Sequence, residues 1–319
     1  ALKMIFTFIG AGIILVTIPI ISKIPISKPL QYFITLVFVF DSFRAFGSAL
    51  FRTIEKMEKE ALVNIVTQVF VLVTGLVLLA RFKTPEGLAA AYAIGSGGGL
   101  ILSAYFSRRY IKTIVSKFDK KIIKRILSSA WPFSVAGIMG AVMLNTDIVL
   151  LGWFKNATEV GLFSAAQKPI LLLYLIPSFV AGAFFPIFAR AANKDNVQFR
   201  LALEKNLAAV FLFAIPVTIG LFFTSDQVIS LLYGTGYERA STPLSILSFT
   251  ILLTFPISII TNALFAYDRQ RELIIFGVLG AFSNVILDLI LIPSFGIVGC
   301  AWATLITQAI GSLWLWKKM

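Results

Sequence analysis

The chain has 319 residues, of which 58% are hydrophobic and only 13% are charged, and its mean hydropathy is +0.92. Soluble domains are far more polar, so this composition excludes an ordinary soluble protein and predicts a polytopic membrane protein. The formal net charge is +13, the chain has no His, and Cys300 is its single cysteine. An internal disulfide is therefore excluded, and the commonest general base and metal ligand is absent. These facts argue against an enzyme and against a cofactor or metal site.

Ten apolar runs are long enough to cross a hydrocarbon core of ~30 Å, which takes about 20 helical residues. The chain enters the first run almost directly after Ala1, so we expect residues to be missing at the N-terminus. The predicted fold class is all-α, with transmembrane helices over 4–21, 30–51, 62–80, 87–106, 128–154, 160–188, 206–223, 243–266, 273–292 and 297–316.

The basic residues are concentrated in every second predicted loop. If the first helix runs outward, 20 Lys and Arg side chains fall in cytoplasmic segments and six in external loops. This bias follows the positive-inside rule and explains the net charge without nucleic acid as a partner. It places the C-terminus on the cytoplasmic side of a bacterial or archaeal cytoplasmic membrane.

The segment 107–125 carries eight Lys and Arg residues and is also predicted to be cytoplasmic. Its pattern predicts an amphipathic helix on the membrane surface, with a basic face toward anionic headgroups. A solvated loop is the alternative. The apolar face would be formed by residues at helical spacing, namely Ile111, Ile114, Val115, Phe118 and Ile122.

A weak internal repeat divides the chain. The segment from Ser48-Ala-Leu-Phe51 to Ala93 recurs, in the same direction, from Asn262-Ala-Leu-Phe265 to Trp302. Parallel repeats are typical of transporters with two six-helix halves, although short patterns of small residues also align by chance. We therefore expect two pseudo-symmetric lobes, the first lacking two helices. The predicted parts are a partial lobe of four helices (1–106), the linker helix (107–125) and a six-helix lobe (126–319).

Five motifs stand out along the chain: Trp131-Pro132-Phe133, Asn145 to Gly152, Val160 to Lys168, Asn284 to Asp288 and Ile292 to Gly299. They resemble motifs of the polysaccharide, or O-antigen, flippases. The superfamily of these flippases also contains the multidrug and toxic-compound extruders and the lipid II flippases. The resemblance implies a two-lobed helical transporter that works by alternating access, and the short first lobe departs from it.

Five ionisable side chains lie inside the predicted spans, and these are the candidate functional residues. Near the bilayer centre, inserting each charge costs a free energy of ~2.5 to 3.5 kcal/mol, which is too much unless the charge is paired or faces water. Such residues are therefore taken as functional candidates. They are Asp41, Arg44, Asp147, Lys168 and Asp288.

Asp147 and Lys168 lie at matching depth on consecutive antiparallel helices. Asp147 comes seven residues before Phe154 and Lys168 eight after Val160, which puts both ~10 to 12 Å below the outer surface. The two side chains can therefore form an ion pair. In the functional interpretation Lys168 binds a pyrophosphate or acidic sugar, and Asp147 changes partners or takes up a coupling proton. Alternatively, the two charges neutralise each other between packed helices.

Asp41 and Arg44 are three residues apart on one helix face, so they can pair with each other. In the functional interpretation Arg44 binds the anionic headgroup while Asp41 orients it. Asp288 follows Asn284 by one turn, near the outer end of its helix, and is predicted either to snorkel or cap or to form a cation site.

The amides of Asn145 and Gln167 are further candidate substrate ligands. Amides in membrane helices, including Asn262 and Gln308, more often form interhelical hydrogen bonds. The run Gly95-Ser-Gly-Gly-Gly99 is predicted to let a neighbouring helix approach closely.

The resemblance favours a flippase that moves an undecaprenyl-pyrophosphate-linked oligosaccharide to the external leaflet. Its expected partners are that lipid-linked oligosaccharide, membrane lipids, a coupling proton or sodium ion, and polysaccharide-assembly proteins. A multidrug efflux antiporter of the same superfamily is the alternative. The external loops are short and carry no recognisable acid and base pair, which argues against a membrane enzyme.

Overall fold

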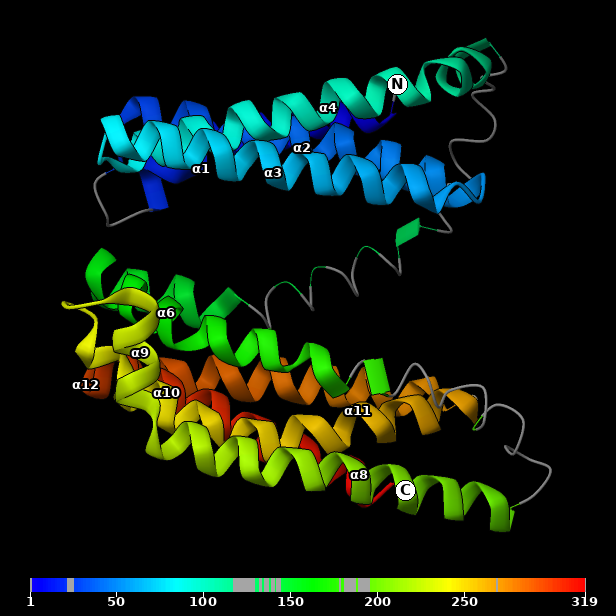
Figure 1. The fold of residues 1–319 in the computed structure, drawn as a ribbon, viewed down its shortest axis with the longest axis vertical. Coiled ribbons are helices and arrows are strands. Elements are labelled where there is room, and N and C mark those ends of the chain that lie inside the picture. The colour runs from blue at the N-terminus through cyan, green and yellow to red at the C-terminus, as the bar shows by residue number, and fades with distance from the viewer. Residues whose placement is uncertain are drawn as a thin grey trace. The chain divides into compact units, whose positions relative to one another are not determined.

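The computed structural model describes residues 2–21, 26–116, 145–177, 196–267 and 269–318, together with positions 130, 131, 134, 138, 141, 179, 180 and 188. Every regular element within these residues is helical, which confirms the predicted all-α fold class. The chain divides into two compact units, Ala1–Ser128 and Ser129–Met319. The helices of each unit pack against one another (Figure 1).

Seven helices of the described residues are long and apolar enough to cross a membrane, or up to eight if one bent pair counts as a span. The polytopic architecture is therefore confirmed. One of the seven, α12 (Gln270–Trp316), contains two predicted spans, because a break at Gly296 divides it between 273–292 and 297–316. Of the predicted span 128–154, the structure describes only 145–154 continuously, and these residues are helical.

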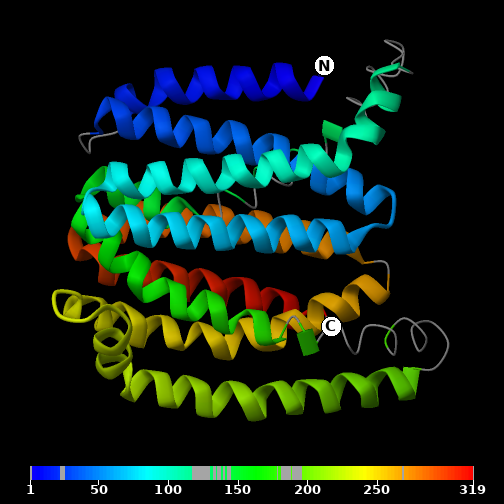
Figure 2. The same cartoon turned by 45° about the horizontal axis from the view of Figure 1, so that its top comes forward.

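Four helices form unit 1: α1 (Leu2–Ile21), α2 (Lys28–Thr53), α3 (Met57–Arg81) and α4 (Pro85–Ser116). Both α2 and α3 pack along α4, and α1 packs against α2 (Figures 1 and 2). The Ser27 hydroxyl accepts a hydrogen bond from the Leu30 amide at the start of α2 and donates one to Glu86 of α4. This side chain therefore caps one helix and ties it to the beginning of another.

The predicted glycine run is confirmed as a site of close helix packing. A Cβ atom at Gly95 would lie 2.8 Å from the backbone nitrogen of Val71 and 2.9 Å from its Cα. One turn later, a Cβ at Gly99 would lie 2.9 Å from Cγ2 of Thr67. Because real Cβ atoms do not approach this closely, glycine at both positions is what lets α4 lie against α3.

The linker helix does not begin as a separate element. Instead, α4 continues past the predicted boundary at residue 106 to Ser116, and the Ser107 hydroxyl bonds to the Ser103 carbonyl within the same helix. No Gly or Pro interrupts 100–116, so nothing in the local sequence breaks the helix there. Residues 117–125 of the predicted linker lie outside the described residues.

Unit 2 is built around one broken and one bent element. The break at Gly296 has φ 56° and ψ −131°, a conformation that only glycine adopts readily. The segment from Glu238 to Ala266 bends by 42° between Ser248 and Thr250. The described helices of this unit, besides α12, are α6 (Ala157–Leu173), α8 (Asn196–Phe223), α9 (Ser225–Tyr233), η1 (Glu238–Ala240), α10 (Ser241–Ser248) and α11 (Thr250–Ala266).

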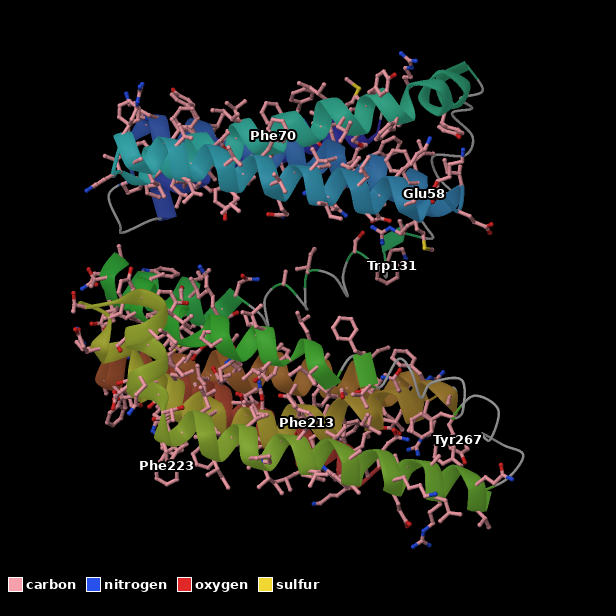
Figure 3. All side chains as sticks on the ribbon, in the orientation of Figure 1. Glu58, Phe70, Trp131, Phe213, Phe223 and Tyr267 are labelled. Carbon is pink, nitrogen blue, oxygen red and sulfur yellow. The ribbon has the colours of Figure 1, made fainter. Side chains whose placement is uncertain are left out.

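In unit 2, α11 packs against both α8 and α12, and α10 contacts α6 and α12. Large apolar side chains lie on the outer surface of the helices as well as in the core. Figure 3 shows Phe70 on α3 and Phe213 and Phe223 on α8, all of which are exposed. In water such surfaces would aggregate, whereas in a bilayer they meet lipid tails.

We predict that Gly95→Ala destabilises the protein by about 1 to 3 kcal/mol, because the added methyl group would overlap the backbone of α3. The midpoint of thermal unfolding in detergent should fall measurably.

Gly98→Ala is the matched control, since its Cβ would lie 3.6 Å from the Phe70 ring, an ordinary contact. Equal unfolding midpoints for the two variants would contradict the proposed close packing.

Candidate functional site

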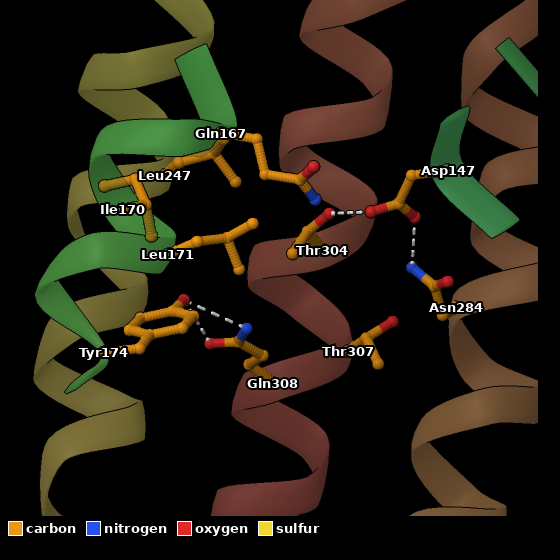
Figure 4. A pocket seen from close by; sticks show the side chains of 10 residues that line it. All are labelled: Asp147, Gln167, Ile170, Leu171, Tyr174, Leu247, Asn284, Thr304, Thr307 and Gln308. Atoms are coloured by element: carbon orange, nitrogen blue, oxygen red, sulfur yellow. Dashed lines mark hydrogen bonds between the residues drawn. The ribbon is translucent and has the colours of Figure 1, made fainter. Parts of the chain in front are cut away.

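Asp147 is a buried carboxylate that joins three helical segments of unit 2. It lies on the helical stretch 145–154 and is 3% exposed. The Nδ2 group of Asn284 donates a hydrogen bond to its Oδ1 at 2.9 Å, and the Thr304 hydroxyl lies 3.0 Å from its Oδ2 (Figure 4). Asn284 and Thr304 belong to opposite sides of the break in α12, so the fold at Gly296 brings both of them to this carboxylate.

Asp288 lies one helical turn after Asn284 on the same face of α12 and is 0% exposed. Oxygen atoms of Asp147 and Asp288 and the Cys300 sulfur all lie within 4.8 Å of one another. Two acidic side chains and a thiol therefore share one buried space within a membrane span.

The oxygen atoms at this site outnumber the donors. Three oxygen atoms have no hydrogen-bond partner among the described residues: both carboxylate oxygens of Asp288 and the Oδ1 of Asn284. The Thr304 hydroxyl is 3.0 Å from the Cys300 carbonyl as well as from Asp147, yet it has only one proton to donate. Within the described residues, the site is thus a cluster of acceptors in which no positively charged side chain pairs with the carboxylates.

A cluster of this kind is costly unless something positive enters it. Burying a carboxylate without a partner carries a large free-energy penalty, and two like charges at this distance repel each other strongly. None of the ion pairs between described side chains involves Asp147 or Asp288. A proton or a small cation bound between the two groups would remove both costs, and oxygen is the ligand that hard cations prefer.

A cavity of about 80 Å³ lies beside Asp147. Its polar lining side chains come from α6 and α12, with Tyr174 directly after α6 (Figure 4). This is room for a few water molecules, and the polar lining can hold them. The residues that line it are Asp147, Gln167, Ile170, Leu171, Tyr174, Leu247, Asn284, Thr304, Thr307 and Gln308.

The predicted ion pair between Asp147 and Lys168 is not present. Asp147 points to Asn284 and Thr304, whereas Lys168 is exposed and does not line the cavity. The rotation of α6 turns the neighbouring Gln167, and not Lys168, toward the cavity.

Asp41 and Arg44 do pair, as their spacing predicted. The guanidinium Nη2 of Arg44 is 3.0 Å from Asp41 Oδ1, and Nη1 donates to the Asn64 amide oxygen on α3 at 2.6 Å. The pair lies in unit 1 and also links α2 to α3. A role in substrate binding for Arg44, or in orienting it for Asp41, stays a prediction.

Two further predictions about single residues are corrected. Asp288 neither snorkels nor caps, because both of its oxygens are buried and unbonded among the described residues. The Asn145 side chain is exposed and donates to the Ala141 carbonyl of its own helix at 2.8 Å, and it has no interhelical partner among the described residues. Gln308 does bond between helices, as expected, through Thr254 and Tyr174.

Cys300, Thr304 and Tyr174 were not predicted as site residues. Cys300 and Thr304 are four residues apart and so share one helix face. Across the break, this face is turned toward the face of α12 that carries Asn284 and Asp288. These two pairs at i, i+4 spacing on either side of Gly296 are the only signal in the sequence that could have pointed to Cys300 and Thr304.

We predict that Asp288→Asn raises the midpoint of thermal unfolding in a sodium-free, alkaline buffer, in which neither a cation nor a proton neutralises the pair. The change removes the repulsion between two buried carboxylates at nearly constant volume, and a gain of ~1 kcal/mol corresponds to about 2 to 4 °C.

Asp226→Asn on α9 is the control, since that carboxylate is exposed. If Asp288→Asn lowered the midpoint while the control left it unchanged, the repulsion inferred here would be wrong.

Known proteins match both the sequence and the fold. The family model described as "Polysaccharide biosynthesis protein" matches residues 1–242. "Probable flippase AglR" of Haloferax volcanii is 28% identical over 171 residues, which cover 52% of this chain and 36% of that one. "Probable low-salt glycan biosynthesis flippase Agl15" of the same organism is 26% identical over 216 residues, covering 67% and 46%. The chain thus matches less than half the length of each of these relatives.

The fold is similar to that of a solved lipid II flippase, MurJ, in its inward closed conformation. The TM-score is 0.74 at 19% identity, and the match covers 99% of this chain and 69% of that one. At this identity the likeness speaks for the fold alone. Because the family model spans about three quarters of the sequence, the chain belongs to the polysaccharide biosynthesis protein family.

Proposed function

We propose that this chain is part of a flippase that carries an undecaprenyl-pyrophosphate-linked oligosaccharide across the cytoplasmic membrane by alternating access. The names of its relatives, a flippase and a glycan biosynthesis flippase, support the substrate class. The C-terminus and the segment 107–125 would lie on the cytoplasmic side, where the basic residues are concentrated. Polysaccharide-assembly proteins are its expected partners.

The observation that carries this proposal is the acidic pair of Asp147 and Asp288. A transporter that is driven by an ion gradient needs an ion site inside the membrane whose occupancy favours one conformation over another. The pair offers buried, unbonded oxygens within unit 2, and Asp147 holds helix 145–154 against both sides of the α12 break. Binding of a proton or sodium ion there would change the attraction between these helices and so couple the ion gradient to transport.

Lys168 is the candidate ligand for the pyrophosphate. It is exposed in the middle of an apolar helix and forms no ion pair with the described residues. A lysine that faced lipid tails at this depth would cost ~2.5 to 3.5 kcal/mol, so a hydrated surface or an anionic ligand is the economical environment. Arg44, whose charge is already partly neutralised by Asp41, is the weaker candidate.

A multidrug extruder is the second function that the fold could serve. Its cationic substrates would require acidic groups on the substrate surface, whereas the two buried aspartates of unit 2 are bonded or enclosed within the helix packing. The exposed intramembrane charge on α6 is positive, which favours an anionic substrate.

We predict that Asp147→Asn and Asp288→Asn in the full-length protein each lower glycan display by about tenfold or more in a flippase-deficient strain, because either change removes charge that holds the coupling cation. Display is measured by glycan-specific labelling at equal membrane expression. Asp226→Asn is the matched control and should leave display intact. Full display from both buried-site variants would refute coupling through this pair.

A second experiment tests the substrate ligand. Lys168→Ala should lose most glycan display, while Lys168→Arg should retain a substantial part, because a guanidinium also binds phosphate oxygens. Lys205→Ala on α8 is the control for loss of an exposed basic residue. Display from Lys168→Ala at the level of the control would remove Lys168 from the mechanism.

A further inference from the structure

A hydrogen-bonded cluster closes one end of the cavity beside Asp147. The Tyr174 hydroxyl donates to Thr250 Oγ1 at 2.5 Å, and Gln308 Nε2 donates to the Tyr174 oxygen at 3.2 Å. The Thr254 hydroxyl completes the cluster by donating to Gln308 Oε1 at 2.8 Å. Three elements are thereby tied together: the end of α6, the beginning of α11 and the second half of α12.

This cluster lies at the bend between α10 and α11. Thr250 is the first residue of α11, and the direction of the chain changes by 42° between it and Ser248. Leu247, on the other side of the bend, lines the cavity and accepts a hydrogen bond from the Thr250 hydroxyl. A change in the bend would therefore pull directly on Tyr174 and on the wall of the cavity.

The other end of the cavity reaches Asp147, one member of the acidic pair. Figure 4 shows Gln167 beside Thr304, which bonds to Asp147, while Tyr174 and Gln308 lie at the opposite end. From Gln167 to Tyr174 the chain advances seven residues, or ~10 Å along a helix. The cavity thus spans the distance between the cluster and the Asp147 carboxylate.

The lining carries oxygen atoms that need a partner. Thr307 is 4% exposed, and its Oγ1 atom has no hydrogen-bond partner among the described residues. The Oδ1 atom of Asn284 also lacks a partner among these residues. Water or a partly hydrated cation would satisfy both. An ion that enters a dry site must exchange its water for protein oxygens step by step, and hydroxyl and amide groups at intermediate positions serve this exchange.

We propose that the cavity is the hydrated chamber through which the coupling cation reaches Asp147, and that Tyr174, Gln308 and Thr250 form the latch that closes it. The proposal rests on the cation site proposed above and adds the route to it. Straightening or twisting of the α10–α11 bend breaks the bond between Tyr174 and Thr250 and opens the chamber. In the closed state described here, the acidic pair is shielded from water on that side.

Cys300 provides a built-in probe of this access. It is the single cysteine of the chain, is fully buried, and its sulfur is within 4.8 Å of oxygens of both aspartates. A small neutral thiol reagent such as iodoacetamide can reach it only when the chamber opens. The alkylation rate of Cys300 therefore measures the population of the open state.

The experiment uses the full-length protein in detergent, with any cysteine outside this chain replaced by serine. Tyr174→Phe keeps the ring but removes the hydroxyl that holds the latch, and we expect Cys300 alkylation to accelerate about tenfold. Gln308→Met, of similar volume, should act in the same direction. Tyr233→Phe on α9, whose ring stacks on Tyr237 away from the cavity, is the control and should leave the rate unchanged.

Repeating each measurement with saturating NaCl, with KCl and at acid pH separates the two proposals. Each rate is divided by the rate of the unfolded protein at the same pH, because iodoacetamide reacts with the thiolate, whose population falls in acid. Protection of Cys300 by sodium or acid that is lost in Asp288→Asn supports the cation site. If Tyr174→Phe and Gln308→Met react at the rate of the unchanged protein while this protection remains, the latch is wrong and the cation site stands. If both variants react faster but no ion protects Cys300, the latch stands and the cation site is wrong.

Discussion

The cost of placing two carboxyl groups in one buried space inside a membrane span governs the organisation of unit 2. Asp147 and Asp288 gain no lysine or arginine partner among the described residues. Asn284 and Thr304 bond to Asp147, whereas neither oxygen of Asp288 has a hydrogen-bond partner among these residues. A stable protein that carries such a pair must offset the repulsion from outside the chain, by a proton or a cation. The same cost that makes the pair expensive makes its occupancy a strong determinant of conformation.

The breaks in the helices make this arrangement reachable. Gly296 divides α12 so that its two halves present Asn284 and Thr304 to one carboxylate, and the bend before Thr250 brings a hydroxyl to Tyr174. Continuous helices would have satisfied their own backbone and left these side chains apart. Unit 1 differs, because there Gly95 and Gly99 let α4 pack at close range against α3, and its intramembrane charges, Asp41 and Arg44, bond to each other.

Hydropathy was sufficient to predict the all-α fold and most of the spans, because a helix in lipid must satisfy its own backbone and must be about 20 apolar residues long. The rare charges inside the spans were singled out as candidate functional residues, and they include both members of the buried pair. Their partners could not be predicted. From depth alone, Lys168 was predicted as the partner of Asp147. In the structure the rotation of the helices makes Asn284 and Thr304 the partners instead, and these lie 137 and 157 residues away in the chain. Tyr174 and Thr304 are ordinary residues whose role follows from position alone.

The central claim is that a cation held by the Asp147–Asp288 pair drives the movement of a lipid-linked oligosaccharide. Its most direct test is flipping of a labelled polyprenyl-pyrophosphate oligosaccharide by the full-length protein in proteoliposomes, with an imposed sodium or pH gradient of either direction. The account predicts that one of these gradients drives net accumulation in one leaflet, that reversing the gradient reverses the accumulation, and that Asp288→Asn abolishes the dependence. Flipping at the same rate and to the same extent under every gradient, in the unchanged protein and in the variant alike, would contradict it.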